Sequence, residues 1–142
     1  MSTDTLAFIG GGQMARALVG GLIAGGHPAG AIRVADPLAG QRASLAGEFP
    51  GVLAVAENAD AADGAGTWIL AVKPQQMRAA CEPLARLAAG QRPLVVSVAA
   101  GIRLAELSAW LGPGAAVVRC MPNRPALLRA GITALVAAPS VG

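Results

Sequence analysis

The sequence has few of the side chains on which several common kinds of binding site depend. Its 142 residues include two Trp, two Phe, no Tyr, one His, one Lys and two Cys. So few aromatic rings offer little surface for stacking bases, and the arginines are dispersed, although the formal net charge is +3. Cys81 and Cys120 lie far apart in apolar surroundings, which favours small buried side chains over a metal or redox pair. We therefore expect no nucleic-acid partner and no metal site.

Long hydrophobic runs are also missing. The longest apolar stretch, near PLVVSVAAGI, is about ten residues long, whereas a membrane-spanning helix needs about 20. The N-terminal segment MSTDTLAF has an acid and no basic residue before its apolar part, so it predicts a folded strand rather than a secretory signal. We expect no membrane partner and a cytoplasmic location. An apolar fraction of 54% with 13% charged residues excludes a disordered chain.

Short strand-like apolar runs alternate with longer helix-like stretches along the chain. The predicted strands are residues 5–9, 31–35, 52–55, 67–72, 93–98, 115–121 and 132–138, and the predicted helices are residues 13–24, 40–48, 74–88 and 104–111. This alternation predicts an α/β fold in which a doubly wound, mostly parallel sheet carries helices on both faces, the Rossmann type. The length predicts one domain, residues 1–142.

The segment FIGGGQMARALVGGL contains a G-x-G-x-x-A motif between the first predicted strand and the first predicted helix. Gly10 would let the chain turn out of the strand, and Gly12 would let the backbone approach a pyrophosphate at the helix N-terminus. Ala15 would allow the helix to pack closely on the strand. The alternative interpretation is a tight strand-to-helix turn that binds no ligand.

Asp36 follows the second predicted strand, 21 residues beyond Ala15. An acid at this place can accept hydrogen bonds from an adenosine ribose and favours a free 2′-hydroxyl. Alternatively, Asp36 caps the helix that begins near Pro37. Arg42 lies close enough in sequence to pair with a 2′-phosphate, so the choice between NAD and NADP stays open.

Later strand ends carry further candidate residues. Lys73 precedes Pro74 at the end of the strand 67–72, which places the only lysine at the sheet edge where α/β folds bind ligands, unless it is simply a solubilising surface residue. The small residues of SVAAGI, 97–102, would let a nicotinamide ring lie against the backbone, or they form a simple tight turn. Pro122 and Asn123 follow the strand 115–121, where Asn123 offers an amide at the same edge.

Together, the segments FIGGGQMARALVGGL, AVKPQQM, SVAAGI and VVRCMPNRPALLRAGITAL resemble the N-terminal domain of the pyrroline-5-carboxylate reductase family, and the resemblance covers essentially the whole chain. It implies an NADPH- or NADH-dependent oxidoreductase that reduces the C=N bond of 1-pyrroline-5-carboxylate to L-proline, in proline biosynthesis. It implies cofactor contacts at Ile9, Gly10, Gly11, Gly12, Gln13, Met14, Asp36, Asn58, Ala71, Val72, Lys73, Pro74, Val98, Ala99 and Ala100, and places Met121, Pro122 and Asn123 near the substrate. Arg124 departs from the pattern, because the family usually has Thr there.

The same resemblance implies a helical C-terminal domain that dimerises, grips the substrate carboxylate and supplies a catalytic hydroxyl. Nothing in residues 1–142 matches that domain, so we assign no catalytic residue here and expect this chain to bind cofactor without appreciable turnover. The full-length family is expected to form homo-oligomers. Two alternatives stay open: a β-hydroxyacid-dehydrogenase-like oxidoreductase, and a dinucleotide-binding module without catalytic activity.

Overall fold

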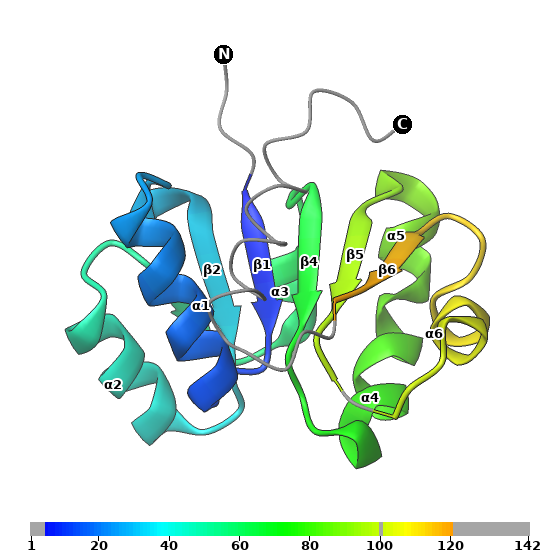
Figure 1. Cartoon of the computed structure of the whole chain (residues 1–142), viewed down its shortest axis with the longest axis horizontal. Helices are drawn as coiled ribbons and strands as arrows, with labels where there is room; N and C mark the ends of the chain where they lie inside the picture. Colours follow the sequence, from blue (N-terminus) through cyan, green and yellow to red (C-terminus); the bar gives the residue numbers. More distant parts are fainter. Residues whose placement is uncertain (1–4, 100, 121–142) are drawn as a thin grey trace.

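A six-stranded parallel sheet forms the centre of the fold (Figure 1). The computed structural model describes residues 5–99 and 101–120. The strands are β1 (Leu6–Ile9), β2 (Ile32–Ala35), β3 (Leu53–Val55), β4 (Thr67–Leu70), β5 (Leu94–Ser97) and β6 (Ala116–Arg119). They lie in the order β3-β2-β1-β4-β5-β6, and every pairing between them is parallel. The predicted parallel α/β fold is thus confirmed, while the predicted strand 132–138 lies outside the described residues.

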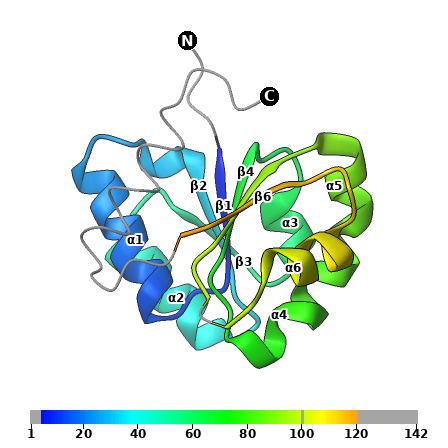
Figure 2. The same ribbon diagram turned by 45° about the vertical axis from the view of Figure 1, so that its right-hand side comes forward.

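Helices cover both faces of the sheet, as the prediction required. They are α1 (Gln13–Ala24), α2 (Ala39–Glu48), α3 (Asn58–Ala62), α4 (Pro74–Cys81), α5 (Ala85–Gln91) and α6 (Leu104–Leu111), with short 3-10 turns η1 (Ala29–Ala31) and η2 (Glu82–Leu84). Figure 2 shows α1 and α2 on one side of the strands and α3 to α6 on the other. Each side has its own apolar core, one around Phe8 and Leu18 and the other around Trp68 and Met77. Burial of these two faces holds the strand ends in place.

Two details of the helices differ from the sequence prediction. The single helix expected over residues 74–88 is divided into α4, η2 and α5, because Pro83 in η2 has no backbone N–H to continue the helical hydrogen bonds. Helix α3 was not predicted at all. It has only five residues, and its buried side chains are the alanines Ala61 and Ala62, which give no hydrophobic periodicity.

The two cysteines differ in their surroundings. Cys81 is fully buried, as expected, and burial raises the pKa of its thiol to about 12. Cys120 is only half-buried, because it follows the edge strand β6, and partial burial raises the pKa of its thiol as well. Within residues 5–99 and 101–120, no cluster of three or more His, Cys, Asp or Glu side chains could hold a metal ion. In the same part of the chain, no helix is long and apolar enough to cross a membrane.

Candidate functional site

The order in which the chain adds strands to the sheet reverses between β1 and β4, at the centre of the sheet. From β1, the chain proceeds through β2 and β3 in one direction, and from β4 through β5 and β6 in the other. The loops after β1 and β4 therefore leave this point toward opposite faces, which is where open α/β sheets bind ligands. Backbone pairing continues past the strands: Gly10 N donates to Ala35 O, and Ala71 N donates to Ile9 O, both at 2.9 Å.

Gly10 must be a glycine for reasons that lie within the protein. Its φ of +106° is one that other residues rarely adopt. A Cβ on Gly10 would also lie 2.9 Å from the carbonyl oxygen of Ala71, in the loop after β4. The first glycine of the motif thus allows the β1 and β4 loops to approach each other.

Gly11 is confined by side chains from the β2–α2 unit. A Cβ on Gly11 would lie 2.9 Å from Leu45 Cδ1 and 3.0 Å from Asp36 Oδ2. The Gly11 N–H donates a hydrogen bond to the same Asp36 oxygen at 3.2 Å. A side chain at Gly11 would therefore require Asp36 and Leu45 to shift.

Gly12 is different, because neither its backbone conformation nor packing within the described protein requires a glycine. Its φ is −75°. Apart from the chain neighbours of Gly12 and the backbone of its own helix, no described heavy atom lies within 4 Å of the position that a Cβ would take. Gly12 is the N-cap of α1, where no side chain caps the helix and no acidic residue lies in the first turn. The helix start thus offers uncapped N–H groups and the positive end of the helix dipole beside open space, which suits a phosphate group.

Asp36 and Arg42 lie together after β2. The Asp36 carboxylate is buried, and its Oδ1 accepts a hydrogen bond from Leu38 N at 2.9 Å while its Oδ2 accepts from Gly11. Asp36 does not cap α2, since the N-cap is Leu38 and no side chain caps that helix. Arg42 Nη1 donates to the Asp36 carbonyl oxygen at 2.9 Å. The two side chains that could distinguish a 2′-hydroxyl from a 2′-phosphate therefore lie at the same strand end.

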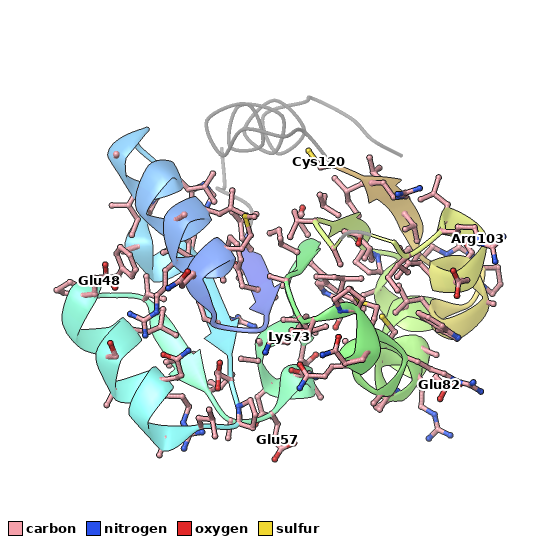
Figure 3. All side chains as sticks on the ribbon, turned by 60° about the horizontal axis from the view of Figure 1, so that its bottom comes forward. Glu48, Glu57, Lys73, Glu82, Arg103 and Cys120 are labelled. Carbon is pink, nitrogen blue, oxygen red and sulfur yellow. The ribbon has the colours of Figure 1, made fainter. Side chains whose placement is uncertain are left out.

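The other predicted cofactor contacts with described positions lie at this same edge. Asn58 opens α3 after β3, and Ala71 and Val72 follow β4, all half-buried. Lys73 is exposed directly before α4, which starts at Pro74, and no described side chain pairs with its ammonium group. With this edge turned forward, Figure 3 shows Lys73 between the start of α1 and α4.

After β5, the backbone of the predicted nicotinamide region is held by a buried hydroxyl. Ala99 N donates to Ser97 Oγ at 3.4 Å, and Ser97 is fully buried. Val98 is half-buried, so a small surface remains at the strand end. Ala100, Met121, Pro122 and Asn123 lie outside the described residues.

The sequence analysis missed a hydrogen-bonded pair of side chains, Gln41 and Arg16, of which Gln41 contacts the glycine loop. Gln41 Nε2 donates to the Gly11 carbonyl oxygen at 3.3 Å, and Arg16 Nη2 donates to Gln41 Oε1 at 2.7 Å. Arg16 Nη1 also pairs with Glu48 Oε1 at 2.8 Å. The only available clue was the helical spacing of Gln41, Leu45 and Glu48 along one face of α2, which does not identify a contact with a loop so distant in sequence.

Comparisons with known proteins agree with the geometry. A family model described as "NADP oxidoreductase coenzyme F420-dependent" matches residues 5–101. Pyrroline-5-carboxylate reductase of Pseudomonas aeruginosa is 54% identical over 137 residues, which are 96% of this chain and 50% of that protein. The structure of a pyrroline-5-carboxylate reductase from Coxiella burnetii is 35% identical with a TM-score of 0.82, over 89% of this chain and 47% of that one.

A pyrroline carboxylate reductase from Plasmodium falciparum, solved with NADP bound, has a TM-score of 0.73 over 90% of this chain and 45% of that one. At 21% identity, this likeness shows the fold alone. The chain spans about half the length of the curated relatives it matches.

Proposed function

Because the chain belongs to the family of NADP oxidoreductases described as coenzyme F420-dependent, we propose that it is the dinucleotide-binding part of a pyrroline-5-carboxylate reductase. In this proposal, the whole protein reduces the C=N bond of 1-pyrroline-5-carboxylate to form L-proline. The substrate assignment rests on the 54% identity to the Pseudomonas aeruginosa reductase and on the motifs after β1, β4 and β5. NADPH or NADH is the proposed hydride donor.

The observation that carries the cofactor assignment is the open space beside Gly12 at the uncapped start of α1. Open space also surrounds other glycines such as Gly30, but at Gly12 it lies beside the uncapped N–H groups of an α-helix start, where a ligand can approach the backbone. The pyrophosphate would meet this helix start, and the adenosine ribose would lie by Asp36 and Arg42. The nicotinamide would lie along Val98 and Ala99.

The described residues have binding and orienting roles in this reaction. When bound, the dinucleotide supplies a hydride from its nicotinamide ring. Ser97 is fully buried and its hydroxyl oxygen accepts from Ala99 N, so we assign it the role of holding the turn after β5. Lys73 is an exposed cation at this edge, and its place after β4 suits an anionic group of the cofactor or the substrate. Proton donation is assigned to no described residue.

The test is to measure binding and turnover separately. We expect the purified 142-residue chain to bind NADPH or NADH in calorimetric titration but to form little proline from 1-pyrroline-5-carboxylate. The reason is that substrate positioning contributes a large part of catalysis, and the resemblance places the substrate-gripping residues in the family's helical domain. A longer protein that joins this chain to such a domain should form proline.

Any of three results would contradict this proposal. Failure of the chain to bind both dinucleotides would remove the cofactor assignment. Rapid proline formation by the chain alone would show that its own residues, such as Lys73, hold and protonate the substrate. Oxidation of a 3-hydroxy acid in place of imine reduction by the longer protein would favour the β-hydroxyacid dehydrogenase alternative.

Asp36 should influence the choice between the two dinucleotides. We expect Asp36→Asn to shift the ratio of dissociation constants toward NADPH by about tenfold, because the change removes a negative charge from the ribose region while Arg42 remains. Calorimetric titration with NADPH and NADH measures the ratio. Asp63→Asn is the control, since Asp63 is an exposed aspartate after α3 and away from β2's carboxyl end. An unchanged ratio in Asp36→Asn would mean that Asp36 only holds the backbone of Gly11 and Leu38 and does not influence the choice of dinucleotide.

A further inference from the structure

The hydrogen bond between Gln41 and the Gly11 carbonyl determines more than the position of that carbonyl. The carbonyl of Gly11 and the N–H of Gly12 belong to one planar peptide unit, and none of the described peptide bonds is cis. In a trans peptide, these two groups point in opposite directions. Because Gln41 Nε2 holds the carbonyl at 3.3 Å, it directs the N–H of Gly12 away from Gln41.

Arg16 fixes which end of the Gln41 amide faces the loop. Its Nη2 donates to Gln41 Oε1 at 2.7 Å, so the amide nitrogen must face Gly11. A flipped amide would set its oxygen against the Gly11 carbonyl and its N–H groups against the guanidinium, and both contacts would be repulsive. Arg16 is itself held by Glu48 at 2.8 Å, and its side chain is only 20% exposed.

The preceding peptide unit of the loop is fixed as well. Its N–H, that of Gly11, donates to the buried carboxylate of Asp36, and Leu45 packs against the same glycine. Both peptide units beside Gly11 are therefore oriented by side chains from the end of β2 and from α2. A loop held in this way loses little conformational freedom when it binds a ligand, which increases affinity.

We propose that Gln41, oriented by Arg16, is a positioning residue that aims the N–H of Gly12 at the pyrophosphate of the nicotinamide dinucleotide. This inference rests on the proposed function, because it requires the dinucleotide to bind at the start of α1. Gln41 is half-buried, so water can replace its hydrogen bonds when the side chain is changed. The change should consequently affect cofactor affinity more than the stability of the fold.

Gln41→Met tests the inference because it keeps the length of the side chain and removes the amide. We expect about tenfold weaker binding of NADPH in calorimetric titration and little change in the thermal unfolding midpoint. Gln91→Met is the matched control: Gln91 also donates to backbone carbonyls, those of Ala62 and Ala65, but it lies before β5, at the opposite edge of the sheet. It should bind NADPH as the unaltered chain does.

Two further measurements separate positioning from general loosening of the loop. In NMR spectra of the ¹⁵N-labelled chain, saturating NADPH should shift the Gly12 amide signal less in Gln41→Met than in the unaltered chain. Arg16→Met should weaken binding when Gln41 is present and have no added effect in the Gln41→Met background, since Arg16 acts through Gln41.

The outcomes are distinct. Undiminished NADPH affinity in Gln41→Met, or an unchanged Gly12 shift, would overturn the inference and leave the proposed function intact. A full Arg16→Met effect in the absence of Gln41 would overturn the role given to Arg16 and show that it contacts the phosphate directly. Absence of binding by the unaltered chain would contradict the proposed function itself, and this inference with it.

Discussion

The Gly12→Val chain should fold normally and bind NADPH and NADH at least about 100-fold more weakly than the unaltered chain. The described protein leaves room for a side chain to begin at this position, because φ is −75° and no described heavy atom lies within 4 Å of the Cβ position. The chain neighbours of Gly12 and the backbone of its own helix are left out of that comparison. The valine side chain would instead occupy the space in which we place the pyrophosphate. Two or more charge-assisted hydrogen bonds from the start of α1 would then be lost, at about 1.5–3 kcal/mol each.

Calorimetric titration measures this loss, and circular dichroism with thermal unfolding verifies the fold. Gly30→Val is the control, because Gly30 also has open space around its Cβ position but lies in η1, before β2 at the opposite edge. It should bind both dinucleotides normally. Equal binding by Gly12→Val and the unaltered chain would mean that the pyrophosphate does not approach Gly12.

Gly10→Ala should differ from Gly12→Val, because we expect it to lower the stability of the fold itself. A φ of +106° costs a non-glycine residue about 1–3 kcal/mol, and the new methyl group would lie 2.9 Å from the backbone oxygen of Ala71. Backbone cannot move aside as a flexible side chain can. We expect the free energy of unfolding to fall by about 3 kcal/mol or more.

Urea denaturation of Gly10→Ala, compared with Gly30→Ala, measures this effect. The midpoint should drop markedly for Gly10→Ala and change little for Gly30→Ala, where the Cβ position is open. Equal midpoints in the two variants would show that the β1 and β4 loops can separate at little cost. Gly10 and Gly12 would then no longer have separate roles in stability and in binding.

Much of the fold could be predicted from the sequence because its signals are local. All residues of β1, β4 and β5 are buried, so these strands appear as short runs that are apolar except for Thr67 and Ser97 at strand ends. Helix α1 begins after Gly12 and ends before Gly25, and its predicted bounds agree with the structure. By contrast, α3 is too short to show a periodic pattern, and Pro83 divides a segment whose composition is otherwise helical.

The candidate site was predictable to the extent that it consists of strand ends. Asp36 and Lys73 could be placed at the carboxyl edge because Asp36 directly follows β2 and Lys73 lies three residues after the end of β4. The partners of Gly11 could not be predicted in the same way, since Gln41 lies 30 residues away in sequence and its contact depends on how α2 packs. The motif assigned different roles to Gly10 and Gly12 but none to Gly11, and the contacts of Gly11 with Asp36 and Leu45 became visible only in the structure.

The central position of β1 in the sheet affects how the protein folds during synthesis. Of the described strands, β1 leaves the ribosome first, yet Leu6 pairs with Ile32 on one side and with Thr67 on the other. Until β4 has emerged, one edge of β1 has no partner, and nascent apolar strands with unpaired edges are prone to aggregate. The glycine loop also reaches its final shape only after Ala71 has been translated, because the oxygen beside Gly10 belongs to that residue. The loop beside which we place the pyrophosphate is thus synthesised early but takes its final shape only after β4 and Ala71 have followed.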